Sequence, residues 1–269
     1  MMWLFLLAMP ALAGPFKWVE LSSTELALQE SGKTFFVYRH GAGRDCCYLH
    51  PVNTPAGVTV TDDGPVDHKH HRGIFWGWPQ VERNGTKGDS WLRKGAEHRF
   101  DRIVEKKVFD DEALLRVEHT WLLDGKPVAK ETVTIQAFLK HQMNVSLRME
   151  ALDAPLRIAG APEQNKGYGG FSARFAPRKA TKLRSNKGPV EKDEDHVPHS
   201  WAELEGAYED GRAVLRIQSL PGNPGYPNEW CLRHYGFIGA NFPGVSGYTL
   251  QPGQPVTLRY TVTVSDVKP

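Results

Sequence analysis

Alternation of apolar and polar residues at period two is the main pattern along this chain. It is clearest in six segments, at residues 58–61, 102–109, 113–121, 128–138, 143–149 and 256–264, and residues 34–38 add a β-branched and aromatic run typical of a strand. Such a pattern places successive side chains on opposite faces of a strand, one buried and one solvated. Turn residues separate several of these segments, including Asp110-Asp111 and Asp124-Gly125. The pattern therefore predicts consecutive antiparallel strands, with few helices.

Strands of about five to ten residues with regular turns are typical of a β-sandwich or a larger supersandwich. No linker rich in Gly, Ser or Pro divides the 269 residues, and nothing repeats at a fixed period. We therefore expect an all-β, antiparallel fold with a single domain over residues 14–269. Residues 161–170 and 184–200 read as long loops, which often carry function.

The N-terminus is apolar over residues 1–13 and ends in Ala11-Leu12-Ala13, the small-residue pattern of a signal-peptide cleavage site. This predicts export to the periplasm or the exterior, with a mature chain from about Gly14. The segment is too short to span a bilayer, and no other segment is apolar enough to do so. The sequence therefore predicts no membrane span.

Composition narrows the classes of function. The formal net charge is +2 and no long basic run occurs, so there is no electrostatic case for nucleic acid as a partner. Three cysteines do not make a disulfide framework. Either Cys46 or Cys47 could pair with Cys231 in an oxidising compartment, but buried thiols are favoured.

The densest cluster of titratable residues lies at 67–78. If this run is extended, one face carries His68, His70, Arg72, Trp76 and Trp78. That face would combine titratable groups with flat aromatic surface, as a site for a sugar ring requires. The alternative is a polar turn that enters a core strand, with packed tryptophans and structural histidines. The clustering favours the functional interpretation, because unpaired buried cations are costly.

Three further segments have unusual local chemistry. Residues 165–170 form a Gly-rich turn that contains Lys166 and precedes a strand pattern, so it is not a phosphate-cradling loop before a helix. Trp201 ends a polar loop and is either a core residue or a stacking platform. Residues 221–228 form a proline-fixed loop that contains Asn223, followed by Trp230, Arg233 and Tyr235. The structural alternative for this last segment is a rigid corner that packs an aromatic cluster.

These motifs together resemble a known bacterial family. Residues 67–73 with Trp76 resemble the DHPHHRG segment of the methane oxygenase PmoA-like family. Residues 166–170, 201–203 and 223–227 fit it too, as do Trp230, Arg233 and Tyr235-Gly236. The resemblance runs from about Tyr48 to the C-terminus, with Lys69 where the family commonly has proline and Glu203 where it often has aspartate. It implies an exported β-sandwich similar to the galactose-mutarotase-like supersandwiches, among relatives associated with sugar degradation.

Our first hypothesis is a carbohydrate-active enzyme of epimerase, lyase or hydrolase type, acting on a small molecule or an oligosaccharide. His70 or His71 would transfer the proton, with Arg72 and Arg233 binding the substrate's oxygens. The predicted substrate-binding residues share polar or aromatic side chains near these motifs: Asp67, His68, Trp76, Trp78, Lys166, Trp201, Asn223, Trp230 and Tyr235. A two-carboxylate hydrolase is possible on this sequence, but carboxylates cannot be paired from sequence.

Two alternatives remain open. His68 and His70 share the spacing of a divalent metal site on a strand, with His98, His119 or a carboxylate as the third ligand, and an oxygenase would require such a metal. A non-catalytic glycan-binding module is the other alternative. It predicts a shallow aromatic strip with scattered histidines, whereas catalysis predicts that His70, His71 and Arg233 converge in one pocket with a perturbed histidine pKa.

Overall fold

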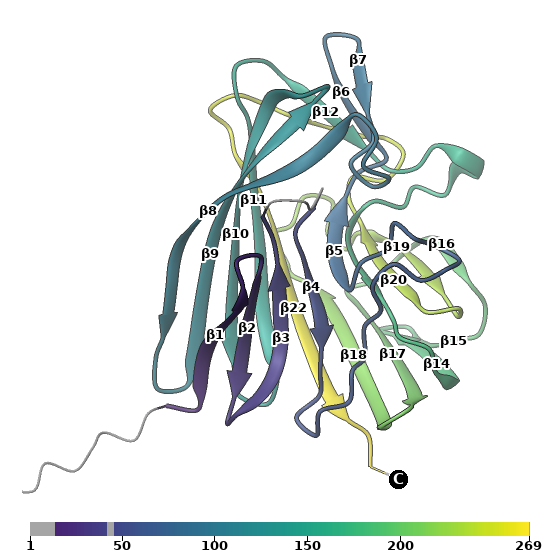
Figure 1. Ribbon diagram of the computed structural model, residues 1–269. Helices are drawn as coiled ribbons and strands as arrows, with labels where there is room; N and C mark the ends of the chain where they lie inside the picture. Colours follow the sequence, from purple (N-terminus) through teal and green to yellow (C-terminus); the bar gives the residue numbers. More distant parts are fainter. Residues whose placement is uncertain (1–13, 42–45, 269) are drawn as a thin grey trace, which may run out of the picture.

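The computed structural model describes residues 14–41 and 46–268. The predicted signal peptide at residues 1–13 lies outside the described residues. Within the described part, antiparallel strands make up the regular structure together with one short 3-10 helix, Glu163–Asn165 (Figure 1). The prediction of an all-β, antiparallel fold is confirmed.

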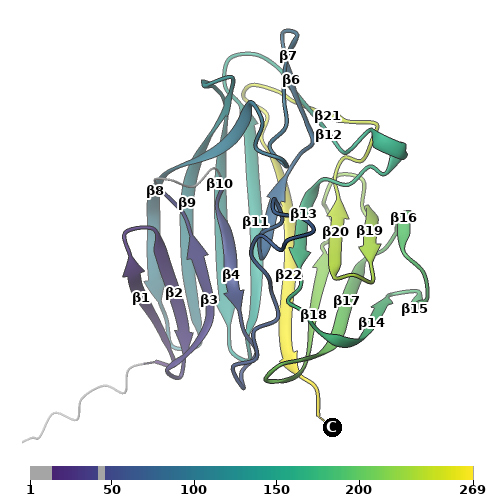
Figure 2. The ribbon, with the colours of Figure 1, turned by 45° about the vertical axis from the view of Figure 1, so that its right-hand side comes forward.

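Two large sheets face each other as the layers of a sandwich (Figure 2). The first sheet, which carries the site described below, has its strands in the order β1 (Phe16–Ser22), β2 (Glu25–Glu30), β3 (Lys33–Arg39), β4 (Tyr48–Val52), β5 (Ile74–Gly77), β13 (Gly170–Arg174), β20 (Phe237–Asn241), β19 (Glu229–Arg233) and β16 (Glu194–Pro198). The second sheet has the order β15 (Gly188–Val190), β14 (Lys179–Ser185), β17 (Trp201–Tyr208), β18 (Gly211–Ser219), β22 (Val256–Asp266), β11 (Gln142–Ala151), β10 (Lys126–Phe138), β9 (Glu112–Leu123) and β8 (Ala96–Val108).

A smaller sheet lies at one end of the sandwich. Its strands are β21 (Tyr248–Leu250), β12 (Leu156–Ala159), β6 (Gln80–Arg83) and β7 (Thr86–Gly88), in that order. Asn84 and Gly85 join β6 to β7 with positive φ angles of 50° and 80°. That pair is the Asn-Gly sequence that a tight hairpin turn prefers.

The long alternating segments became the long strands of the second sheet. Along β9, Ala113, Leu115 and Val117 face the core while the residues between them stay partly exposed. Asp124-Gly125 turns the chain into β10 with positive φ at both residues. Local alternation and turn chemistry were therefore sufficient to predict these strands.

Two local predictions were wrong. Residues 184–200 are not a long loop, because they contain β15 and β16 as well as the end of β14. These strands are short, and β16 pairs with the sequence-distant β19. Residues 58–61, which alternate, form only isolated bridges at Thr59 and Thr61. In each case the pairing partner, rather than the local pattern, determined the outcome.

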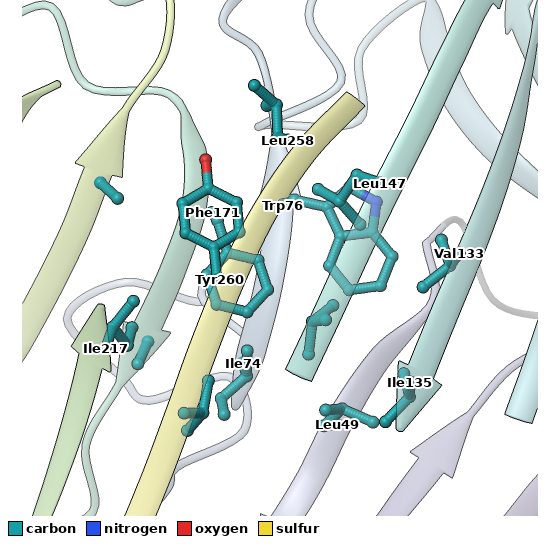
Figure 3. Close-up of a cluster of buried hydrophobic side chains, with 14 of the residues drawn as sticks. Leu49, Ile74, Trp76, Val133, Ile135, Leu147, Phe171, Ile217, Leu258 and Tyr260 are labelled. Carbon is teal, nitrogen blue, oxygen red and sulfur yellow. The ribbon is translucent and has the colours of Figure 1, made fainter. Parts of the chain in front are cut away.

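The core lies between the two large sheets and is filled by side chains from both (Figure 3). Phe171 of the first sheet stacks on Tyr260 of the second, with ring centroids 4.4 Å apart and an interplanar angle of 8°. Ile74 and Trp76 from β5 enter the same cluster. Since neighbouring residues on a strand point in opposite directions, the residues between these anchors face outward.

One buried ion pair lies within this apolar interior. His119 Nδ1 lies 2.7 Å from a carboxylate oxygen of Glu131, and Tyr38 OH lies 2.8 Å from His119 Nε2. Burial disfavours charge on His119, but the nearby Cys47 and Glu131 outweigh it and raise the pKa of His119 to about 10. Hydrogen bonding to His119 lowers the pKa of Glu131 against the opposing effect of burial. The pair is therefore charged at neutral pH.

Two further findings concern the thiols and the membrane. Cys46, Cys47 and Cys231 are all buried thiols, so the structure shows no disulfide from either adjacent cysteine to Cys231. Across the described residues, no helix has the length and apolar character that crossing a bilayer demands.

Replacing one member of the buried pair tests its role in the fold. We expect Glu131→Gln to lower the free energy of unfolding by about 3 to 5 kcal/mol, because the His119 charge loses its partner in a dry interior. Glu118→Gln on β9 is the matched control, since its carboxylate pairs with Arg102 at the surface. It should change stability by less than about 1 kcal/mol in the same denaturant titration. Equal losses in the two variants would contradict this account.

Candidate functional site

The histidine-rich segment is a compact turn rather than the first half of a strand. His68 N–H donates to the Pro65 carbonyl, His71 N–H donates to the His68 carbonyl, and Gly64 N–H donates to the His71 carbonyl. The predicted alternation across His68, His70 and Arg72 is therefore wrong. The strand β5 begins only at Ile74, after Gly73, where a Cβ would overlap the Leu49 carbonyl.

This turn gathers three imidazole rings. His68 and His71 stack with centroids 4.6 Å apart, and His70 meets His71 edge-on at 4.6 Å. His68 stacks on Tyr235 at 5.0 Å on its other side. His71 also packs on Phe237 at 5.0 Å. The turn thus places all three rings on the outer face of the first sheet.

The outer face of the sheet forms the floor beneath these rings. Cys231 and Arg233 point outward from β19 because Trp230 and Leu232, with which they alternate, point into the core. Arg233 pairs in register with Phe237 of β20. The burial of alternate residues on these strands therefore determines which side chains the site receives.

Together these elements enclose a cavity of about 290 Å³. The residues that line it come from four separate segments of the chain: His68, His70, His71, Trp91, Leu92, Lys166, Tyr168, Cys231, Arg233, Tyr235 and Phe237. The lining is aromatic and basic, and no Asp or Glu occurs among these described residues. The volume is at the small end of the range for small-molecule sites.

Two of these histidines, His70 and His71, are held in their neutral form. Burial, the neighbouring His68 and the Arg93 guanidinium lower the pKa of His70 to about 4. Burial and the adjacent His70 lower the pKa of His71 still further. At neutral pH both imidazoles can therefore accept a proton.

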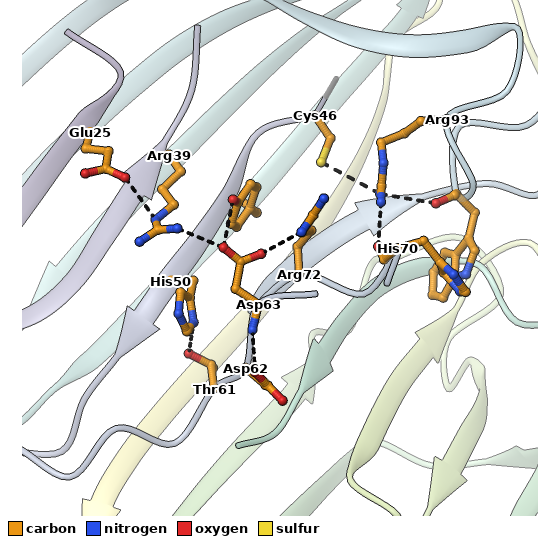
Figure 4. A network of polar contacts seen from close by, with 12 residues as sticks. Glu25, Arg39, Cys46, His50, Thr61, Asp62, Asp63, His70, Arg72 and Arg93 are labelled. Carbon is orange, nitrogen blue, oxygen red and sulfur yellow. Dashed lines mark hydrogen bonds and ion pairs between the residues drawn. The ribbon is translucent and has the colours of Figure 1, made fainter. Parts of the chain in front are cut away.

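Arginine side chains hold the surrounding loops in place. Arg93 donates to the His70 carbonyl at 2.9 Å and lies 3.9 Å from Cys46 Sγ (Figure 4). Arg233 donates to the Glu194 carbonyl at 2.7 Å and to the Asp195 carboxylate at 2.6 Å. These contacts limit the motion of the cavity walls.

Asp67 does not line the cavity, and its half-exposed side chain borders a separate hollow beside Arg174 and Tyr235. Its carboxylate accepts hydrogen bonds from Arg174 at 2.8 Å and contacts His68 Nδ1 at 2.9 Å. Burial opposes the charge, but hydrogen bonds from Arg174 and His68 hold the pKa of Asp67 well below its usual value. Asp67 is therefore placed to orient His68.

Two polar atoms in the cavity wall are buried and have no hydrogen-bond partner among the described residues: Nδ1 of His71 and Nε1 of Trp91. Buried polar groups without partners are uncommon in folded proteins. Both side chains line the cavity, so a polar ligand could satisfy them there.

The structure brings six predicted site residues together. They line one cavity and come from both halves of the chain: His68, His70, His71, Lys166, Arg233 and Tyr235. The proximity of the histidine turn to the strand after the proline-rich loop is the arrangement that the catalytic hypothesis required.

Other predicted residues lie elsewhere. Trp76, Trp78 and Trp230 are fully packed in the core, so their faces cannot stack on a substrate. Trp201 lies on the outer face of the second sheet, with the Arg216 guanidinium 4.0 Å from its ring centroid. Inward packing of alternate residues is the physical reason for the errors at Trp76, Trp78 and Trp230, whereas Trp201 belongs to the other sheet.

Arg72 and Asn223 also have structural partners instead of facing the cavity. Arg72 binds Asp63 at 3.0 Å, in a network that extends through Arg39 (Figure 4). The Asn223 amide donates to Ser219 Oγ at 3.0 Å and to the Arg259 carbonyl at 2.8 Å. It anchors the proline-rich loop to the second sheet. The proposed roles of both residues at the reaction centre are therefore corrected.

Several lining residues were missed. Trp91 and Leu92 come from the turn after β7, and Tyr168 comes from the Gly-rich turn. Nothing local marks Trp91 as a site residue. Cys231 could have been found, because strict alternation with Trp230 and Leu232 places it on the same face as Arg233.

The donor set does not fit the predicted metal site. Among the described residues, no three His, Cys, Asp or Glu side chains converge as metal ligands would. His68 and His70 meet edge-on at 5.7 Å, and His68 Nδ1 already contacts Asp67. His98 and His119 are buried between the sheets and cannot supply a third ligand.

The neutral state of His70 can be measured directly. In a proton NMR titration of the folded protein, the His70 ring signal should shift with a midpoint near pH 4. In concentrated urea it should titrate near the ordinary value of about 6.5. Because protonation of His70 is harder in the folded state, acidification from pH 6.5 towards 4 should also reduce stability. A folded-state midpoint at or above the urea value would show that the cavity does not suppress the charge.

Several solved structures resemble this chain. Galactose 1-epimerase from Lactobacillus acidophilus NCFM is similar, with a TM-score of 0.52, 9% identity, and coverage of 95% of this chain and 100% of that one. A putative mutarotase from Salmonella typhimurium has a TM-score of 0.48 and 8% identity, over 94% and 97% of the two chains. A GalM/aldose epimerase homologue from C. elegans has a TM-score of 0.42 and 10% identity, over 95% and 100%. The first of these likenesses shows that the chain shares the fold of the galactose 1-epimerase.

No curated protein sequence matches this chain. A family does match, over residues 25–269, and its description is "Family of unknown function (DUF6807)". The resemblance to a methane oxygenase PmoA-like family is therefore wrong, because nothing in the matching family points to that activity. The match covers most of the chain, so this protein belongs to the DUF6807 family of unknown function.

Proposed function

We propose that this protein is a carbohydrate-active enzyme that transfers a proton in the histidine cavity, as an epimerase or lyase does. One observation carries the proposal: neutral His70 and His71 share a cavity with Lys166 and Arg233. The fold is one in which a galactose 1-epimerase has been solved, which favours a sugar as substrate. Because fold alone does not determine function, the chemistry of the cavity has to support the rest.

His70 is the better candidate for the base. Its side chain is only about half buried, whereas His71 packs against Phe237 deeper in the cavity. A neutral imidazole accepts a proton from carbon or oxygen, and a histidine of low pKa returns it readily. In an epimerisation the proton taken from one face of the carbon is replaced by a proton delivered to the opposite face, and in an elimination it is lost as the bond to the leaving group breaks and the double bond forms.

Positive charge in the wall would stabilise the intermediate. Lys166 and Arg233 line the same cavity as His70, and Arg233 is held rigidly by Glu194 and Asp195. Removing a proton from a sugar leaves negative charge on oxygen, and fixed cations lower the energy of that state. Tyr168 and Tyr235 offer aromatic surface to the apolar face of a pyranose ring.

The cavity favours this chemistry over two alternatives. A standard two-carboxylate glycosidase needs opposed carboxyl groups, and the described residues that line the cavity include no Asp or Glu. A binding module without catalysis would leave the histidines scattered, whereas these three converge with depressed pKa values in two of them. The proposal also includes export, which rests on the apolar pattern of residues 1–13.

Removing the imidazole of His70 tests the proposal. We expect His70→Ala to lower turnover by at least a hundredfold, because the base is lost. The assay follows anomerisation and deuterium incorporation by NMR, with aldoses, ketoses and uronic acids in D₂O. The thermal midpoint should stay within a few degrees, since Arg93 binds the backbone carbonyl of His70 rather than its ring.

Lys69→Ala is the control, because Lys69 belongs to the same turn but does not line the cavity. It should retain the activity of the unmodified protein. Full activity in His70→Ala, or no reaction with any sugar of the panel, would overturn the proposed function.

A further inference from the structure

A second and larger cleft opens on the same face of the first sheet, outside the histidine cavity. Its volume is about 810 Å³. The walls come from the proline-rich loop, the end of β20 and the segment that follows it, and they include Pro224, Pro227, Phe242, Val245 and Tyr248. Volume and an apolar lining of this kind are typical of small-molecule sites.

Asn241 lies at the floor of this cleft and is only 2% exposed. Neither the amide nitrogen nor the amide oxygen of its side chain has a hydrogen-bond partner among the described residues. Leaving both a buried donor and a buried acceptor unpaired is costly. The amide can therefore form hydrogen bonds with a ligand that offers one donor and one acceptor close together.

Asn228 in the same cleft provides the contrast. Its amide nitrogen donates to the Pro224 carbonyl at 2.9 Å, and its amide oxygen accepts from Ser219 Oγ at 3.0 Å. The Asn228 side chain thus anchors the proline-rich loop, while the Asn241 side chain makes no hydrogen bond to any described residue. The two asparagines are similar in burial but differ in role.

The charges of the cleft are neutralised internally. His196 Nδ1 lies 2.7 Å from the Glu229 carboxylate, and His196 Nε2 contacts the Asn165 carbonyl. No other charged side chain lines the cleft among the described residues. With one buried, unpartnered amide and mostly apolar walls, the lining suits a neutral ligand that has hydroxyl groups on one edge and an apolar face.

The cleft and the histidine cavity are neighbours on two strands. On β20, Phe237 belongs to the cavity and Asn241 to the cleft, and four residues of strand span about 13 Å. On β19, Glu229 lines the cleft while Cys231 and Arg233 line the cavity. Asn165 and Lys166 are consecutive, with one facing each site. One extended ligand can therefore reach both.

We propose that this cleft binds a neutral pyranose residue of an oligosaccharide whose next residues reach the histidine cavity. The Asn241 amide pairs with two adjacent hydroxyl groups, one as donor and one as acceptor. Tyr248, Phe242 and the prolines cover the apolar face of the ring. The assignment of the reacting end to the histidine cavity rests on the proposed function, but binding in the cleft does not.

An array of neutral di- to tetrasaccharides, followed by calorimetric titration with the best binder, tests this inference. We expect Asn241→Leu to weaken binding at least tenfold while its thermal midpoint stays equal or rises, because no internal hydrogen bond is lost. Asn228→Leu should lower the thermal midpoint, since its amide is used within the fold. The thermal measurement thus separates a ligand-binding amide from a structural one.

Filling the cleft gives a second variant that does not depend on Asn241. Val245→Trp at the rim should also weaken binding at least tenfold, whereas Val104→Trp, on β8 of the second sheet, should leave it unchanged. Binding by none of the neutral oligosaccharides, or unchanged affinity in both Asn241→Leu and Val245→Trp, would overturn the inference. The His70→Ala variant separates the two proposals: it should no longer turn over sugars, whereas Asn241→Leu added to it should still weaken oligosaccharide binding at least tenfold.

Discussion

Burial of one face of the first sheet is the constraint on which the site depends. Trp230, Leu232 and Ala240 enter the core, and each forces its neighbours on the strand to the opposite face. Those neighbours include Cys231 and Arg233 of the cavity and Glu229 and Asn241 of the cleft. A site built on packed strands keeps its geometry better than one built on loops alone. These core residues thus support the site without touching a ligand.

In the histidine cavity, the protonation states of the side chains result from the close packing of basic groups. Three histidines share a small aromatic cavity with Lys166 and Arg233, so a positive charge on His70 or His71 is opposed by burial and by its neighbours. These two imidazoles are therefore neutral at a pH where a free histidine is partly charged. The buried His119–Glu131 pair shows the opposite result, because a carboxylate partner holds that histidine in its charged form.

The likeness to a galactose 1-epimerase has a TM-score of 0.52 at 9% identity, which establishes a shared fold and leaves the chemistry to the residues of this chain. The chain also forms a second cleft beside the histidine cavity. The side-chain amide of Asn241 in this cleft has no hydrogen-bond partner among the described residues. The two sites together are consistent with a substrate longer than one sugar ring. Membership of the DUF6807 family connects these features to a group of proteins whose function is unknown.

The sequence by itself determined the fold class, the long strands of the second sheet and most of the chemical groups in the cavity. Alternation and tight turns act between near neighbours, so they can be read along β9 and β10. Only the tertiary structure decided that residues 67–71 form a turn, that Trp76 and Trp230 belong to the core, and that Trp91 belongs to the site. The physical reason is that burial and pairing with sequence-distant strands outweigh local preference, and neither can be seen in a short stretch of chain.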